Sequence, residues 1–299
     1  MSCSRLATKG VVVDSSVQPF IPADTKVLAS VQIAKLEATP LYNNHKEQFK
    51  LAQLQAFSER TGLDSTRDLS EILFAWNGKD FLLIARGHFS QSKLGPKLES
   101  LGARRRSYKN YTLFGDNRNS LAFIHDGFAI AGPYQSLCDV IDGRNKSQAG
   151  IPAELQRRLE AIPKADQIWG VSREGLPVSG IPMRSDIESA LSNIAGVVSS
   201  AAIGIGIDTG IHLQTDLTCI SDEGAQRVRD ALRGGLGLAR LTTKDNQLGL
   251  LRLYDSVHID QQNSVIHVRS DLAPDLANQL LSYIPQLRNR AGRIFETAP

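Results

Sequence analysis

The chain has 299 residues, 41% of them hydrophobic and 22% charged, so it is long enough to bury a sizeable core in two domains or one large one. Its formal charge of +3, from 34 basic and 31 acidic residues, is too small an excess to indicate a nucleic-acid partner. No apolar run approaches the ~20 residues that span a bilayer, and no signal-peptide core follows Met1.

The first nineteen residues carry little helical or strand pattern, which predicts a flexible N-terminal segment over 1–19. Cys3 lies near the start of this segment, where a bacterial lipoprotein carries its acylated cysteine once the signal peptide is removed. On this interpretation a lipid anchor holds the protein in the cell envelope, as a periplasmic or membrane-anchored protein. If Met1 is the native start, Cys3 is an incidental cysteine of a cytoplasmic protein. Both interpretations stay open.

Two segments of the chain open in the same way, with Ile-Pro, a short polar stretch and an apolar strand. Pro22 and Pro163 mark these openings and are 141 residues apart. The repetition predicts an internal duplication. Its parts are a first repeat over 20–143, a linker and short helix over 144–161, a second repeat over 162–288 and a tail over 289–299.

In the first repeat, apolar periodicity predicts the following elements in chain order. They are a helix over 45–61, a hairpin of strands 72–76 and 81–89, a helix holding Leu94, Leu98 and Leu101, strands over 111–114, 121–125 and 128–131, and a helix holding Leu137 and Ile141. The hairpin turn, Asn77 to Asp80, contains the Asn-Gly pair that tight turns favour.

The second repeat predicts the same order. Its elements are a helix over 186–199, a hairpin of strands 201–207 and 211–219, a helix holding Ala225, Val228 and Leu232 that ends at Gly234-Gly235, strands over 250–253, 257–260 and 265–268, and a helix holding Leu276, Leu280 and Ile284. Clustered strands and helices predict an α+β fold of two similar halves, with mainly antiparallel sheets and helices packed on one face. Two separate domains and one shared sheet both fit this pattern.

The chain resembles a family of uncharacterised exported proteins that is frequent in acidobacteria. The resemblance rests on the opening Pro22-Ala23-Asp24-Thr25, on Gly87-His88-Phe89 after the second strand, and on the repeated order of elements. It covers most of the chain, and it implies an exported, envelope-associated protein without an established activity.

Asp208-Thr209-Gly210 resembles the catalytic loop of an aspartic protease. That chemistry needs two aspartates that share a proton, so that one acts as base and the other as acid. The matching turn of the first repeat, Asn77 to Asp80, holds a lysine and no second Asp-Thr-Gly. We therefore expect Asp208 at an exposed hairpin tip, as a turn residue, and keep a hydrolase that uses it as the alternative. On the preceding strand, Gly204 and Gly206 share one face and predict close packing of a helix there.

The last hairpin holds the most specific polar pattern. If residues 261–264 form a four-residue loop, His258 faces His267, with Arg269 further along the same face. Two opposed imidazoles are a candidate start of a zinc or copper site, although the sequence identifies no third ligand. The alternative is the solvated polar face of a half-buried sheet.

The remaining motifs give no catalytic signature. Arg104 to Arg106, with Tyr108 and Tyr111 nearby, form either a basic and aromatic patch or a solvated strand entrance. No nucleophile elbow, metalloprotease helix or phosphate loop is present, so the sequence predicts no cofactor. We therefore interpret the chain as a non-enzymatic, envelope-associated binding or scaffolding module. Its expected partner is a protein or an apolar small molecule.

Overall fold

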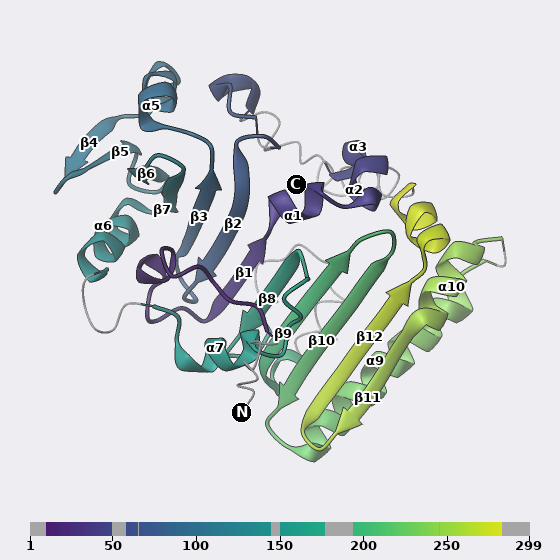
Figure 1. Cartoon of the computed structure of the whole chain (residues 1–299). Coiled ribbons are helices and arrows are strands. Elements are labelled where there is room, and N and C mark those ends of the chain that lie inside the picture. Colours follow the sequence, from purple (N-terminus) through teal and green to yellow (C-terminus); the bar gives the residue numbers. More distant parts are fainter. Residues whose placement is uncertain are drawn as a thin grey trace, which may run out of the picture.

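In the computed structural model, the described part of the chain forms one twelve-stranded antiparallel sheet with helices on both of its faces (Figure 1). The structure describes residues 10–49, 58–64, 66–144, 150–176, 194–244 and 246–282. Across the sheet the strands follow the order β11-β12-β10-β9-β8-β1-β2-β3-β7-β6-β5-β4.

The strands have the following bounds. They are β1 (Val27–Val31), β2 (Leu69–Trp76), β3 (Phe81–Gly87), β4 (Arg105–Tyr108), β5 (Tyr111–Gly115), β6 (Ser120–His125), β7 (Phe128–Gly132), β8 (Ile168–Ser172), β9 (Val198–Ile207), β10 (Ile211–Cys219), β11 (Val257–Gln262) and β12 (Val265–Leu272). The helices are η1 (Gln18–Phe20), α1 (Ile33–Glu37), α2 (Pro40–Asn44), α3 (Lys46–Phe49), α5 (Gln91–Ser100), α6 (Tyr134–Gly143), α7 (Ala153–Leu159), α9 (Asp222–Thr242) and α10 (Leu248–Ser256). Residues 58–61 and 274–282 are also helical.

The two halves of the chain meet at the antiparallel pair β1–β8. From this pair outward the first half runs β1-β2-β3-β7-β6 and the second runs β8-β9-β10-β12-β11, so both add their strands in the same order. The first half then carries the extra strands β5 and β4 at its edge. The α+β class is confirmed and both halves share one sheet, while duplication as the origin of the halves stays a prediction.

Backbone hydrogen bonds around the central pair also repeat at the spacing that separates Pro22 from Pro163. Lys26 O accepts a bond from Arg173 N (3.0 Å), and Gln167 O accepts one from Gln32 N (2.7 Å). Each of these bonds is the other with the two halves exchanged. The β1–β8 pair therefore has a local two-fold relation, whose axis runs through the sheet.

Helices cover both faces of the sheet because the strands of the first half are apolar on both sides. Ile130 of β7 belongs to a core shared with α6 and α7, whereas its neighbour Ala129 belongs to a core shared with α5. Successive side chains of a strand point to opposite faces. The prediction of helices on one face is therefore wrong, since a strand that is buried on both sides needs a cover on each.

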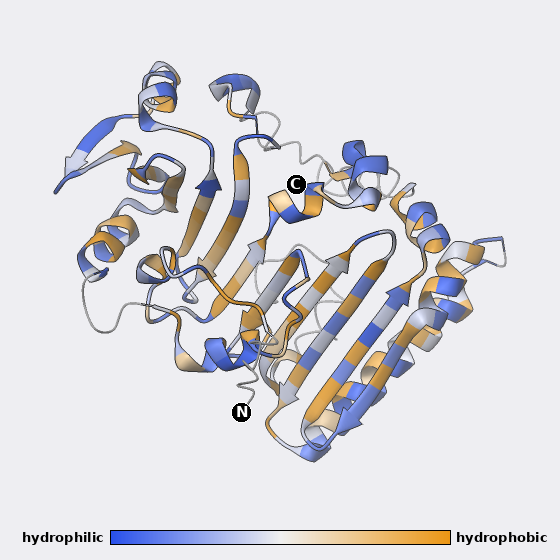
Figure 2. Ribbon diagram, viewed as in Figure 1, coloured by the Kyte–Doolittle hydropathy of each residue, from blue (hydrophilic) through white to orange (hydrophobic). Residues whose placement is uncertain are grey.

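On β10, β11 and β12 of the second half, one face of the sheet is apolar and the other is polar. Ile259 and Ile266 pack with Ala225 and Val228 of α9, which lies behind β11 and β12 in Figure 1. Most side chains on the opposite face of these strands are hydrophilic. Figure 2 shows the resulting alternation of blue and orange along β10 and β12. This is the alternation expected of a half-solvated antiparallel sheet.

Helix α9 is longer than predicted. It continues through Gly234 and Gly235 to Thr242, and it begins where the Ser221 side chain accepts a hydrogen bond from Gly224 N. Both inner glycines are exposed, with no atom within 4 Å of an added Cβ. Glycine lowers helix stability by only about 1 kcal/mol relative to alanine. The packing of the apolar face of α9 against the sheet outweighs that cost, so the glycines do not end the helix.

The predicted strand over 250–253 is wrong, because these residues belong to α10. A short apolar run such as Leu250 to Leu253 fits a buried strand and a helix equally well by pattern alone. Here the run packs as a helix beside α9, where the first half has the hairpin of β4 and β5.

Two predicted helices fall partly outside the described residues. Of the predicted helix 45–61, α3 and residues 58–61 are helical, and 50–57 lie outside the described part. Of the predicted helix 186–199, residues 186–193 lie outside it, while Val198 and Ser199 belong to β9. The final helix is present over 274–282, and Ile284 lies outside the described residues.

Candidate functional site

Asp208 lies exposed at the tip of the β9–β10 hairpin, as expected. Its backbone N donates to Gly210 O (3.1 Å), and its carbonyl accepts a bond from Leu41 N (2.9 Å). Pairing along β1 and β8 places this turn at the Val31 end of the sheet, whereas the turn between β2 and β3 follows Trp76 at the Val27 end. The two matching turns therefore point in opposite directions, and they cannot supply the two aspartates of a protease.

The predicted pairing of His258 with His267 is wrong. The β11–β12 hairpin has a two-residue turn, in which Asn263 adopts a positive φ of 53°, instead of a four-residue loop. This shifts the register by two residues, so His258 faces Arg269 and His267 faces Asp260. The imidazole of His267 instead contacts the neighbouring strand β10, with Nδ1 2.6 Å from Asp216 Oδ1.

The polar face of β10 and β12 holds a second histidine and aspartate pair, His212 with Asp271. Both pairs lie directly across neighbouring strands, which is the arrangement expected of opposite charges on an exposed sheet. In the part of the chain that the structure describes, no group of three or more His, Cys, Asp or Glu side chains could hold a metal ion. The geometry therefore favours a solvated polar face over a metal centre.

The cysteines contribute no reactive site among the described residues. Cys138 and Cys219 are free and buried, and burial raises the pKa of both thiols. A thiol that is held protonated is a poor nucleophile. Cys3, the predicted lipidation site, lies outside the described residues.

The glycine face of β9 is occupied by a carboxylate rather than by a helix. A Cβ at Gly204 would lie 2.2 Å from Asp166 Oδ2, and one at Gly206 would lie 3.0 Å from Asp166 Oδ1. Asp166 is only 3% exposed, and its Oδ2 has no hydrogen-bond partner. Burial raises its pKa, and this effect outweighs the smaller opposite effect of the nearby His212. The two glycines of β9 therefore leave the space that the Asp166 side chain occupies.

The arginines and the tyrosines of the predicted basic and aromatic patch lie in different surroundings. The Arg106 guanidinium lies 4.9 Å from the ring centroid of Tyr134, which belongs to α6. Tyr108 and Tyr111 instead pack against the main core. Arg104 is exposed at the entrance of β4.

The feature that resembles a ligand site is an apolar cavity between α5 and the sheet, which we call the α5 pocket. Its volume is about 260 Å³, and every described side chain that lines it is apolar. Those residues are Leu63, Leu69, Ile72, Leu83, Ala85, Phe89, Leu94, Leu98, Leu121, Phe123, Ala129 and Ala131. Leu83 at its margin is 36% exposed, so the cavity reaches the surface.

Small residues in the middle of the sheet create this hollow. Ala131 lies between Leu83 of β3 and Leu121 of β6 in one row of paired residues. Ala129 lies beside Ala85 in the next row, so this part of the floor is made by methyl groups. The ten-residue helix α5 spans the hollow from above through Leu94 and Leu98.

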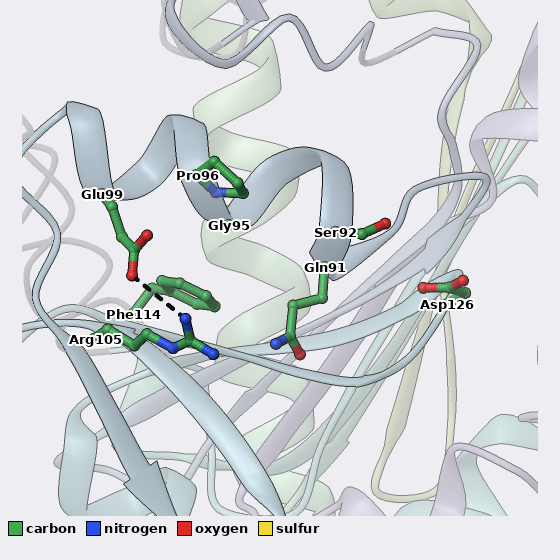
Figure 3. A pocket seen from close by; sticks show the side chains of 8 residues that line it. All are labelled: Gln91, Ser92, Gly95, Pro96, Glu99, Arg105, Phe114 and Asp126. Atoms are coloured by element: carbon green, nitrogen blue, oxygen red, sulfur yellow. Dashed lines mark ion pairs between the residues drawn. The ribbon is translucent and has the colours of Figure 1, made fainter.

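Figure 3 shows how the other side of α5 rests on the sheet. A Cβ at Gly95 would lie 3.0 Å from the Phe114 ring, so glycine allows the helix to approach β5 closely. Glu99 of α5 and Arg105 of β4 form an ion pair at 4.0 Å beside the same ring. These residues line a second hollow of about 450 Å³, which is more polar than the α5 pocket. The helix is thereby fixed along one side.

Sequence reasoning did not find the α5 pocket. The available signal was that β2, β3, β6 and β7 are apolar on both faces, with alanines at positions such as 85, 129 and 131 where larger residues are usual. Hydropathy patterns indicate that a residue is buried. They do not show that the space opposite a small residue is empty.

Fold and site together define an α+β protein with one broad antiparallel sheet and an apolar cavity under a short helix. Solved structures of TP0453 are similar to this chain. Its crystal form III matches with a TM-score of 0.53 and 11% identity, covering 91% of this chain and 99% of that one. Crystal form IV matches with a TM-score of 0.50 and 10% identity, covering 89% and 95%. At such identities the likeness shows the fold alone.

No family model matches the chain, and no curated protein matches it. The resemblance to exported acidobacterial proteins therefore stays a prediction. Among the described residues, none of the helices has both the length and the apolar character needed to span a bilayer.

Proposed function

We propose that the protein is a binding module for an apolar small molecule, which occupies the α5 pocket. The observation that carries the proposal is that a cavity of about 260 Å³ with an entirely apolar described lining opens to the surface beside Leu83. A hollow of this kind offers no hydrogen bonds to water, so water inside it is easily displaced by an apolar group. Ligand sites are usually such clefts with few polar groups.

The size of the cavity limits the ligand. An apolar cavity of roughly 150 Å³ already accepts benzene in other proteins. The α5 pocket is larger than that, and it is smaller than the roughly 300 Å³ at which pockets for drug-sized ligands begin. A single alkyl chain or a small ring compound fits, whereas a sterol or a diacyl lipid would have to extend outside the cavity.

The proposal is tested by titration with N-phenyl-1-naphthylamine, a neutral apolar dye that fluoresces when it leaves water, followed by displacement with 1-decanol. The informative variant is Ala131→Leu, whose added atoms fill the space between Leu83 and Leu121. A matched control is Ala231→Leu, which places the same side chain on the exposed face of α9.

We expect the unmodified protein and the control to bind the dye and to release it to decanol. The filled variant should lose at least tenfold in affinity while it stays folded, because its cavity no longer has room for the dye. Equal binding by the filled variant, or no binding by the unmodified protein, would refute the assignment of the α5 pocket as a ligand site.

We propose in addition that the protein acts at the cell envelope. Cys3 and the opening Pro22 to Thr25 support this location, since both are features of exported proteins in the sequence pattern. The upstream genomic sequence tests it: an export signal that ends before Cys3 is expected, and a native start at Met1 would contradict it.

A further inference from the structure

Beside the α5 pocket lies a second, basic hollow of about 940 Å³, which we call the arginine pocket. It is bounded by the turn that ends α5, over 101–103, and by the turn between β5 and β6, over 115–119. Its basic residues are Arg60, Arg104, Arg106 and Arg118.

The two pockets are neighbours along both of their walls. Leu98 lines the α5 pocket, and Leu101, one helical turn further, lines the arginine pocket. On the sheet side, Leu121 of the apolar cavity follows closely after Asn119 of the basic one. Ala103 lines the arginine pocket and packs against the same core cluster that surrounds the cavity. These walls place the arginine pocket next to the end of the α5 pocket that Leu98 and Leu121 form.

The charges of the arginine pocket are mostly uncompensated within the described part of the chain. Arg104 and Arg118 are exposed, and no described residue forms an ion pair with either side chain. Arg106 is half-buried and fixed, since its Nη1 donates to Asn117 Oδ1 at 2.7 Å and its guanidinium stacks on Tyr134. A guanidinium presents a planar set of donors that matches carboxylate and phosphate groups.

One carboxylate, Asp116, also lines the arginine pocket. Its Oδ1 accepts bonds from Arg118 N and Asn119 N, both at 2.8 Å. These backbone bonds lower its pKa, so it is charged near neutral pH and offsets one of the four guanidinium groups. The nearby guanidinium groups of Arg106 and Arg118 lower its pKa further, and the four arginines leave the pocket with a positive net charge.

We propose that the ligand of the α5 pocket is a single-chain amphiphile with an anionic head group. Its chain occupies the apolar cavity, and its carboxylate or phosphate is held by the arginine pocket. The inference rests on the proposed function and adds the head group to it. Because the two pockets are neighbours along α5 and β6, the chain and the head group bind together, and each increases the effective concentration of the other at its site.

The test measures how well decanoate and 1-decanol displace the neutral dye. Inorganic phosphate is then added to measure whether it competes with decanoate. Decanoate and decanol share the chain and differ in charge. The informative variant is the double substitution Arg104→Gln with Arg118→Gln. The control is Arg227→Gln, which removes one arginine from the exposed face of α9. Thermal unfolding of each variant checks that the fold is retained.

The affinity for decanoate, measured by displacement of the dye, should be about tenfold higher than that for decanol. This is the scale of a charge-assisted hydrogen bond. This preference should vanish in the double variant, persist in the control, and weaken as salt is added.

Equal affinity for decanoate and decanol would overturn the head-group inference and leave the proposed function intact. Failure of both compounds and of the dye to bind would remove the proposed function as well. A preference for decanoate that survives in the double variant would show that the arginines do not hold the head group. Phosphate that binds without affecting decanoate would mark a separate anion site and would also overturn the inference.

Discussion

The two halves of the sheet are covered differently on the same face. In the second half, the 21-residue helix α9 packs Ala225 and Val228 onto Ile259 and Ile266. In the first half, the ten-residue helix α5 crosses strands whose inner positions include Ala129 and Ala131, and a cavity is left beneath it. The same order of strands thus supports two covers, which differ in the length of the helix and in the size of the side chains beneath it.

This difference shows how one arrangement of strands can acquire a binding site without new secondary structure. The strand order gives both halves a sheet face to be covered. The length of the covering helix and the size of the side chains beneath it decide whether that face is filled. The second half also has a hollow of about 250 Å³ at α9 and β11. Its lining is mixed, with the apolar Leu236, Val257 and Ile259 beside Arg233, His258 and Asp260.

The largest difference is expected from truncation of the two cores. Ile266 is fully buried under α9, so Ile266→Ala should lower the free energy of unfolding by about 3 to 4 kcal/mol. Leu121 borders the cavity and is only half-buried, so Leu121→Ala should cost about 1 to 2 kcal/mol. Urea unfolding of both variants measures the two losses. Equal losses would mean that the first-half core is as tightly filled as the second.

A smaller effect is expected at the buried start of α9. A Cβ at Gly224 would lie 2.6 Å from Val197 Cγ1, so Gly224→Ala should destabilise the protein by about 1 to 3 kcal/mol through overpacking. Thermal unfolding measures this loss. An unchanged midpoint would show that α9 does not press on the sheet as closely as described.

The opposite sign is expected further along the same helix. Gly235 is exposed with free space around it, so Gly235→Ala should stabilise the protein by about 0.5 to 1 kcal/mol through helix propensity. Comparison with Gly224→Ala under the same conditions serves as the control. A loss of stability at Gly235 would indicate that the helix does not continue through this position.

The halves also differ at their matching openings. Thr25 N donates to Pro22 O and Asp166 N donates to Pro163 O, both at 3.1 Å, but only the Thr25 side chain bonds back to its own turn. Burial raises the pKa of Asp166, so the folded state favours the neutral acid more than the unfolded state does. The charged form therefore destabilises the fold at neutral pH, and this cost disappears as the pH falls below the ordinary value of 3.8.

Asp166→Asn removes that charge at every pH. We expect it to be more stable than the unmodified protein at pH 7, with an advantage that shrinks towards pH 4. Asp271→Asn, at the exposed partner of His212, is the control and should lack the advantage. An advantage that is independent of pH would mean that the buried charge is not its cause.

The sequence predicted most of the strands and the order in which the halves repeat, because alternating apolar residues and turn pairs such as Asn77-Gly78 are local signals. It failed where tertiary packing decides. Leu250 to Leu253 fitted two structures equally well, and Gly234-Gly235 is a helix stop only if nothing holds the helix beyond it. The register of β11 and β12 was predicted from a four-residue turn, whereas a two-residue turn connects them.

The site was harder to predict than the fold. Asp208 belongs to a motif that resembles a protease loop. The two-fold relation of the halves places the matching turn of the first half at the opposite end of the sheet. Ala131 and Arg104 are separated in the sequence and belong to no common motif. Their two pockets become neighbours only because α5 ends between them. A cavity and the residues around it form only when the chain folds, so a local sequence pattern does not predict them.

The central claim, that the α5 pocket holds an apolar chain, is tested most directly by nuclear Overhauser contacts between decanoate and methyl-labelled protein. If the alkyl chain occupies the α5 pocket, it contacts the methyl groups of Leu83, Leu98 and Leu121. Contacts confined to exposed leucines of α9, such as Leu238 and Leu241, would contradict it, as would the absence of any contact.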